Sequence, residues 1–305
     1  MTNRMGLVVT LLLLTPPAAS AQQPGGRLLS ADNLSQLAPH VWVIMGFPNI
    51  GIVVGSKATL VIDTGLGTKN GQVVASVAKR LSTKGQKLYL TTTHYHAEHA
   101  AGEGGFPQGT VVIRPEIQQA ELESEGQKLI DLFSSRSPED KELLADARIN
   151  PANILFNGSY QLDLGGVDVH LYWFGGAHTK GDEIIQVDPD SVLFTGDVVQ
   201  NKAGPYFYCA DCTPRTWLSV LNQVAQLTPP KIVVPDHSPP GDASLIAQER
   251  DLMAYLQSRI AALKAAGNTA DQATQTLTAE VKDKYPGWTG FNHIDLAVAH
   301  TYAAP

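Results

Sequence analysis

Short apolar runs alternate with polar segments along the chain, and their spacing predicts both strands and helices. Runs rich in β-branched residues, bounded by Gly, Pro or Asn, predict strands over 41–45, 50–54, 59–62, 87–92, 161–164, 168–174, 183–187, 191–194 and 231–234. Helical spacing is found over 71–81, 115–148, 216–227 and 243–266. The first three strands read as an antiparallel meander. The order strands, helix, strand, helix occurs twice, which is typical of an α/β fold.

The last part of the chain, about 240–305, is predicted to be helical and to belong to one domain spanning 22–305. Gly267 is placed to end the first of its helices. Thr269, followed three residues later by Gln272, fits a capping box for another helix. These features indicate packing and carry no chemistry of their own.

The N-terminal residues 1–21 read as a cleavable signal peptide. Arg4 precedes an apolar run over 5–14, and Ala19-Ser20-Ala21 fits a small-x-small cleavage site. A membrane anchor is the alternative, but a run of about ten residues is shorter than the roughly 20 that a spanning helix needs. We therefore expect a periplasmic or secreted protein that begins near Gln22, without stable membrane insertion.

Composition and charge narrow the range of partners. The chain has 305 residues, 43% hydrophobic and 17% charged, so it is not disordered as a whole. Lys plus Arg number 22 against 29 Asp plus Glu, a formal charge of −7, which leaves no basic face for nucleic acid or an anionic membrane. We expect a small-molecule substrate and no nucleic-acid partner. Two cysteines cannot form a four-thiolate metal site, so the nine histidines are the first candidates for metal ligands.

Cys209 and Cys212 lie three residues apart in an aromatic loop between Pro205 and Pro214. In an oxidising compartment such a pair tends to close, and a small local disulfide is our prediction. A redox CxxC site is the alternative. The loop lacks the strand-to-helix junction that a thioredoxin-type motif occupies, so we favour the disulfide.

Four titratable residues follow the strand predicted over 87–92 within six positions: His94, His96, Glu98 and His99. So many buried imidazole and carboxylate groups need hydrogen bonds or a cation to offset desolvation. A metal site supplies that partner, and a solvated His-rich loop is the alternative. The remaining histidines have no ligand-spaced neighbour and are predicted to be surface or hydrogen-bonded core residues: His40, His170, His293 and His300.

Three further candidate ligands each follow a predicted strand: His178, Asp197 and His237. Ligands at the ends of separate strands converge on one edge of a sheet, where neighbouring loops can leave a coordination position open. An open position is a feature of catalytic metal sites, and we expect these residues to form one.

The pattern H-x-H-x-E-H, followed in order by His, Asp and His, resembles the signature of the metallo-β-lactamase superfamily, from Asp63 in a Val-Ile-Asp-Thr-Gly turn to His237. The resemblance implies a four-layer αβ/βα sandwich, here with a C-terminal helical extension, and two metal ions, most simply Zn²⁺. It implies that His94, His96 and His178 hold the first ion. It implies that Glu98, His99 and His237 hold the second, and that the carboxylate of Asp197 bridges the two. Asp63, Thr179 and Asp182 are expected to support these ligands.

Two positions depart from the superfamily pattern. Glu98 stands where Asp is usual, and its extra methylene moves the carboxylate, so the second site is expected to be weaker, shifted or selective for another metal such as iron. Asp197 stands where one major group of β-lactamases has Cys. In this respect the chain is more similar to glyoxalase II, lactonases and related hydrolases.

Together with the predicted signal peptide, the resemblance implies an exported dinuclear hydrolase that activates a water between two metal ions against an ester, lactone, thioester or amide carbonyl. Asp197 is expected to orient that water, and Glu98 to be a ligand and a proton shuttle. A β-lactamase proper, an iron-dependent oxidoreductase of the same fold and a metal-binding module without turnover are the alternatives. The resemblance also implies an apolar wall that holds the substrate, with simple packing as the alternative role of these aromatic residues: Phe47, Tyr206, Phe207 and Tyr208.

Overall fold

The computed structural model describes residues 27–304, so the predicted signal peptide and its cleavage site lie outside the described residues. Two β-sheets form the centre of the fold. The first has the order β1-β2-β3-β4-β5-β6-β7, with strands β1 (Leu34–Ala38), β2 (Val41–Ile44), β3 (Ile50–Val54), β4 (Ala58–Ile62), β5 (Lys87–Thr91), β6 (Val111–Pro115) and β7 (Ile154–Phe156). The second has the order β12-β11-β10-β9-β8, with strands β8 (Ser159–Asp163), β9 (Asp168–Tyr172), β10 (Ile184–Asp188), β11 (Val192–Gly196) and β12 (Ile232–Pro235).

Each sheet combines an antiparallel meander with parallel strands. In the first, β1 to β4 are antiparallel neighbours, which confirms the predicted meander, and β4 to β7 run parallel. In the second, β8 to β11 are antiparallel, and β12 pairs parallel to β11. Parallel pairs require crossovers: α1 (Gly67–Leu81) connects β4 to β5, and α5 (Pro214–Val224) connects β11 to β12.

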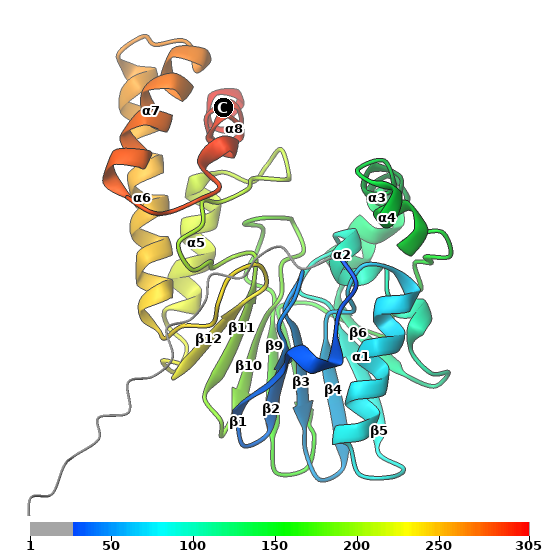
Figure 1. Cartoon of the computed structure of the whole chain (residues 1–305). Helices are drawn as coiled ribbons and strands as arrows, with labels where there is room; N and C mark the ends of the chain where they lie inside the picture. Colours follow the sequence, from blue (N-terminus) through cyan, green and yellow to red (C-terminus); the bar gives the residue numbers. More distant parts are fainter. Residues whose placement is uncertain (1–26, 305) are drawn as a thin grey trace, which may run out of the picture.

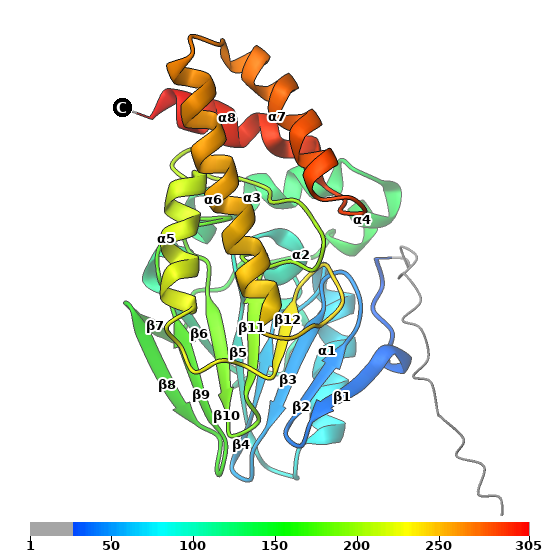
Figure 2. The ribbon, with the colours of Figure 1, turned by 90° about the vertical axis from the view of Figure 1, so that its left-hand side faces the viewer.

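The sheets pack face to face, and helices cover their outer faces. Val, Leu, Ile and Phe side chains from both inner faces, such as Leu60, Val169 and Phe194, form the core between the sheets. Helix α1 packs Val74 and Val77 on the outside of the first sheet. Helices α5 and α6 (Ser244–Ala265) cover the second sheet (Figures 1 and 2). The predicted αβ/βα sandwich is therefore confirmed.

Helices also extend beyond the sandwich. They are α2 (Ala97–Ala100), α3 (Glu116–Ser134), α4 (Pro138–Leu143), α7 (Ala270–Lys284) and α8 (Ile294–Ala303), with 3-10 turns η1 (Ala31–Asn33), η2 (Glu103–Gly105) and η3 (Phe291–His293). The capping box predicted for Thr269 and Gln272 begins α7. No helix within 27–304 combines the length and apolar character needed to cross a membrane.

The loops after β5, β11 and β12 meet at one edge of the sandwich. Helices α3 and α4 stand on one side of this edge, and α7 and α8 stand on the other, with α2 between them (Figure 1). The parallel strands β5, β11 and β12 all end here, and the residues that follow a strand end are free to turn toward one another. Five of the nine histidines lie at this edge: His94, His96, His99, His178 and His237.

Candidate metal centre

The segment from His94 to His99 links β5 to the single turn of α2. His96 occupies the N-cap position in an extended conformation, and the backbone N–H of His99 donates to its carbonyl at 3.0 Å. The side chains of His94, His96, Glu98 and His99 are at most 5% exposed. The turn thus places four titratable side chains inside the protein within six residues.

Three imidazole nitrogens converge to form the first group of ligands. His96 Nδ1 lies 3.0 Å from His94 Nε2 and 3.3 Å from His178 Nε2. Burial lowers the pKa of all three rings, and the neighbouring imidazoles lower it further for His94 and His96, which favours the neutral form of the rings. His178 Nδ1 lies 2.6 Å from the Tyr206 carbonyl, which places the proton on Nδ1 and the lone pair on Nε2. Converging neutral lone pairs fit a divalent cation.

A second group consists of Glu98, His99 and His237, whose ligand atoms lie within 4.8 Å of one another. Glu98 Oε2 and His99 Nε2 are buried and have no hydrogen-bond partner. Burial disfavours the charged carboxylate of Glu98 and raises its pKa to about 8. A cation beside the carboxylate would stabilise the charged form and offset this effect. A buried carboxylate oxygen and imidazole nitrogen without partners fit a second cation.

Asp197 lies between the two groups. Its Oδ2 is 3.4 Å from His178 Nε2 and 4.0 Å from His94 Nε2, and its Oδ1 is 3.6 Å from His237 Nε2. One oxygen therefore faces each group. This is the arrangement that a carboxylate shared by two cations requires.

Asp63 supports the His-rich segment from the turn after β4. It accepts a hydrogen bond from the backbone N–H of Thr93 at 2.7 Å, and its Oδ2 lies 3.0 Å from the Thr93 hydroxyl and 3.1 Å from His99 Nδ1. Its φ of 69° places it in the left-handed region, which a short polar side chain tolerates. By fixing the Nδ1 proton of His99, Asp63 leaves Nε2 free to bind a cation.

The sequence reasoning missed Asp236. Its Oδ2 accepts from the Thr93 hydroxyl at 2.7 Å and lies 3.3 Å from His99 Nδ1. Burial, reinforced by the nearby Asp63 and Asp197 carboxyls, raises the pKa of Asp236 well above its usual range. Asp236 can be grouped with His94 and His99 as a possible metal site, but it contacts the nitrogen of His99 that Asp63 also uses. We therefore interpret it as a support of His99.

Asp182 holds the His178 loop. It accepts backbone hydrogen bonds from Ala177, His178 and Thr179, and the Thr179 hydroxyl donates to its Oδ1 at 2.6 Å. The same loop is held from α3 by Glu121. Two of the predicted supports, Thr179 and Asp182, thus lie in the loop that carries His178 and are bonded to each other there.

The predicted aromatic wall is only partly present. The ring of Tyr208 lies 4.4 Å from that of His96, and Phe47 lies 4.3 Å from His237. Tyr206 lies 6.1 Å from His178. For Phe207 the prediction of a substrate contact is wrong, because its side chain is fully buried and packs into the core beneath α5. Its neighbours Tyr206 and Tyr208 are only half-buried, so Phe207 is the one of the three that turns into the core.

The structure joins Cys209 and Cys212 in a disulfide, within a loop attached to the His178 segment. The Tyr208 N–H donates to the carbonyl of His178 at 3.0 Å. On the other side of the loop, His300 Nδ1 lies 3.0 Å from the Cys212 carbonyl. The loop therefore connects a candidate ligand to helix α8.

Replacing Cys209 and Cys212 together by alanine is expected to lower metal affinity roughly 10-fold, because the freed loop no longer holds the Tyr206 carbonyl against His178. The measurement is competition with a chromogenic chelator, without thiol reductants because they bind zinc themselves. Lys180→Ala, which removes an exposed ion pair to Asp211 in the same loop, is the control. Unchanged affinity in the double variant would contradict this role of the loop.

Glu249 is a buried carboxyl on α6 and is 1% exposed. Its hydrogen bond from the backbone N–H of Gln200 is long, 3.5 Å, and burial raises its pKa from 4.5 to about 8. The folded chain then keeps a proton that the unfolded chain has already lost. Stability from this group is present at low pH and is lost as pH rises from about 4.5 to 8.

Between pH 6 and 8.5, wild-type protein is expected to lose roughly 2 kcal/mol more stability than Glu249→Gln, which cannot ionise. Urea unfolding of both chelated proteins at the two pH values measures the difference. Glu116→Gln, at an exposed position of α3, should behave as wild type. Equal losses in wild type and Glu249→Gln would show that Glu249 is ionised in the folded chain at both pH values.

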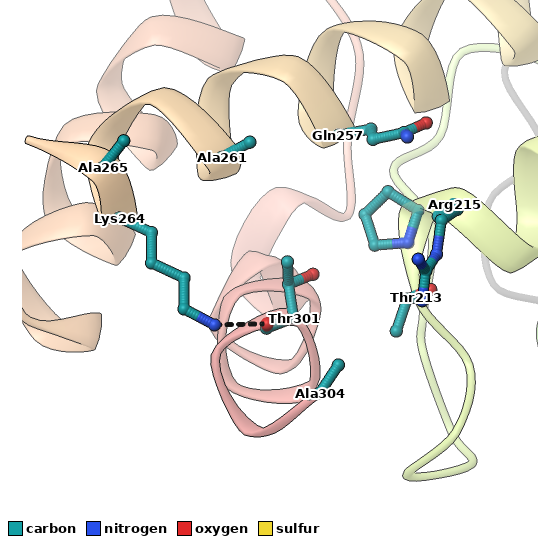
Figure 3. A pocket seen from close by; sticks show the side chains of 9 residues that line it. Thr213, Arg215, Gln257, Ala261, Lys264, Ala265, Thr301 and Ala304 are labelled. Atoms are coloured by element: carbon teal, nitrogen blue, oxygen red, sulfur yellow. Dashed lines mark hydrogen bonds between the residues drawn. The ribbon is translucent and has the colours of Figure 1, made fainter.

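A cavity of about 400 Å³ lies away from these ligands, between α5, α6 and α8 (Figure 3). None of the candidate metal ligands lines it. Its residues are Thr213, Pro214, Arg215, Gln257, Ala261, Lys264, Ala265, Thr301 and Ala304. The clustered histidines and carboxylates, and not this cavity, mark the chemical centre.

A family sequence model described as "Metallo-beta-lactamase superfamily" matches residues 43–237. The match extends from β2 to the last candidate ligand and includes every residue of the two ligand groups. A comparison with curated proteins gives no significant match.

Several solved structures are similar in fold. A metallo-beta-lactamase from Pontibacter korlensis aligns with a TM-score of 0.55 and 22% identity, covering 72% of this chain and 97% of that one. One from Erythrobacter litoralis aligns with a TM-score of 0.55 and 19% identity, covering 73% and 96%. The sec-alkylsulfatase Pisa1 from Pseudomonas sp. aligns with a TM-score of 0.68 and 16% identity, covering 89% of this chain and 50% of that one. At these identities the likeness shows the fold.

Proposed function

The chain belongs to the metallo-β-lactamase superfamily, and we propose that it is a dinuclear metal-dependent hydrolase. The observation that carries the proposal is the position of Asp197, whose two carboxylate oxygens face the two ligand groups at 3.4 to 4.0 Å. A single structural metal would need only one of these groups. Two groups around one carboxylate support a pair of ions.

Two bound divalent ions would supply the activation of water and the polarisation of a substrate carbonyl. The remaining steps belong to residues of this chain. Asp197 would help to hold both ions, one oxygen toward each ligand group, and so would orient the attacking water. Glu98 would help to hold the second ion, and its carboxylate would be the shuttle for the proton that the water gives up toward the leaving group. No covalent bond to the protein is needed.

Two Zn²⁺ ions are the simplest choice for this donor set. Five of the seven candidate ligands are imidazoles, and zinc accepts both imidazole and carboxylate ligands. Iron is the alternative, since the longer reach of Glu98 also suits a metal that prefers more oxygen ligands. Elemental analysis of the purified protein distinguishes the two.

The proposed substrate is a small molecule with an ester, lactone, thioester or amide bond, β-lactams included. Tyr206, Tyr208 and Phe47 supply apolar surface beside the ligands, which supports binding of an acyl group. We further propose that residues 1–21 direct export, so that the enzyme meets its substrate in the periplasm or outside the cell.

The test is turnover by protein that begins at Gln22, first loaded with zinc and then chelated. The panel contains a chromogenic β-lactam, a lactone, a nitrophenyl ester and a thioester. A secondary alkyl sulfate is added because the sec-alkylsulfatase structure aligns with most of this chain.

Chelator-sensitive hydrolysis of any carbonyl substrate supports the proposal, and hydrolysis of the β-lactam makes the protein a β-lactamase. Hydrolysis of the alkyl sulfate alone would replace the carbonyl substrate class. Zinc-replete protein with no turnover on any substrate, or turnover that chelation leaves unchanged, would overturn the proposal.

A further inference from the structure

Gln200 connects the loops that carry two of the candidate ligands. Its side-chain Nε2 donates to Asp197 Oδ1 at 2.7 Å, and its Oε1 accepts from the Ser238 hydroxyl at 2.7 Å. Ser238 directly follows His237 in the loop after β12. One amide therefore spans from the carboxylate between the two groups to the neighbour of the last ligand.

The direction of each hydrogen bond in this network is fixed. The Ser238 hydroxyl accepts from the backbone N–H of Asn201 at 2.7 Å, so its own hydrogen is free to point at Gln200 Oε1. With its oxygen so used, Gln200 must present its NH₂ group to Asp197. An NH₂ group donates, so it favours the ionised carboxylate and holds it in one orientation.

Asn49 holds the far end of the network. Its Nδ2 donates to the carbonyls of Pro235 at 2.8 Å and Ser238 at 3.0 Å. Gln200 and Asn49 are 7% and 2% exposed, so water does not readily replace these contacts. The network leaves Asp197 Oδ1 at 3.6 Å from His237 Nε2.

We propose that Gln200 is the positioning residue of the second metal site. It makes no hydrogen bond to His94, His96 or His178, and it bonds to Oδ1 of Asp197, the oxygen that faces His237. The inference rests on the proposed function, because it needs a centre with two ions. Losing Gln200 should therefore weaken the second ion selectively and leave the first bound.

The test compares wild type with Gln200→Leu and Ser238→Ala, each beginning at Gln22. The matched control is Gln186→Leu, at a buried glutamine of β10 that bonds to Asp188 and contacts no candidate ligand. Zinc per chain is measured by elemental analysis after dialysis, and both dissociation constants are measured by titration against a chromogenic chelator. Circular dichroism checks the fold.

Wild type and Gln186→Leu are expected to bind two ions. Gln200→Leu should bind the weaker ion 10- to 100-fold less tightly, with the tighter ion unchanged. Ser238→Ala should show a smaller loss of the same ion, because it removes only the hydroxyl that donates to Gln200 Oε1 and orients the amide.

Two ions with wild-type affinities in Gln200→Leu would overturn the inference alone. Equal weakening of both ions would also overturn it, because the role would then be general support of the fold. A wild-type chain that binds a single ion would overturn both the inference and the dinuclear proposal. Should Gln200→Leu not fold, Ser238→Ala decides by the same criterion.

Discussion

Asp197→Asn is expected to lower kcat/KM by about 10³-fold or more and to leave the fold intact. The substitution keeps the shape of the side chain but removes its charge. Because Gln200 presents an NH₂ group to Oδ1, the asparagine must turn its oxygen toward Gln200. Its own NH₂ group then faces His94 and His178, where a cation would be repelled.

The measurement is kcat/KM on whichever substrate of the panel wild type hydrolyses, with zinc in excess. His96→Ala, which removes a ligand of the first group, should lose activity to a similar degree. Asp163→Asn, in an exposed ion pair with Lys57, should retain it. Wild-type turnover by Asp197→Asn, with zinc bound, would show that this carboxylate is not part of the chemistry.

Removing the metal is expected to abolish turnover and to lower the unfolding midpoint by roughly 10 °C relative to zinc-saturated protein. The physical reason is the number of buried polar groups that the ions would satisfy. Without cations, Glu98 Oε2 and His99 Nε2 have no partner, and the imidazoles of the first group face one another. A ligand that binds only the folded chain shifts the equilibrium toward it.

Thermal unfolding with and without chelator measures this shift, and restoring zinc should restore the midpoint. His237→Ala should show a reduced shift because it removes a ligand of the second group. His170→Ala, on β9 and outside both groups, should show the full shift. Identical midpoints for chelated and zinc-saturated wild type would contradict the assignment of these residues to a metal centre.

The sequence predicted well those strands and helices whose own residues show a clear hydrophobic spacing. Strands such as β3 and the helix α6 have residues whose spacing alone identifies them, and their observed bounds lie within a residue or two of the predicted ones. Three strands were missed: β1, β6 and β7. β7 has only three residues, and β1 is a five-residue strand with two polar residues in its middle and no buried residue, so neither carries a periodic signal.

The candidate ligands follow strand ends and so could be named from sequence, whereas their supporting contacts could not. Asp236 contacts His99 across a separation of 137 residues, and Gln200 reaches Ser238 across 38. A side chain that supports another across the fold has no fixed spacing in sequence. For Asp236 a weak signal existed, since it directly precedes a candidate ligand. For Gln200 the only signal was its place three residues after Asp197.

The ligands come from both halves of the sandwich. Each group takes two residues from the segment after β5, in the first sheet, and one from a loop of the second sheet, His178 or His237. Neither half alone offers three ligands to an ion. A folding intermediate with only one sheet formed would therefore have no complete site. Metal binding would then follow the packing of the two halves against each other, late in folding, and would stabilise the assembled chain.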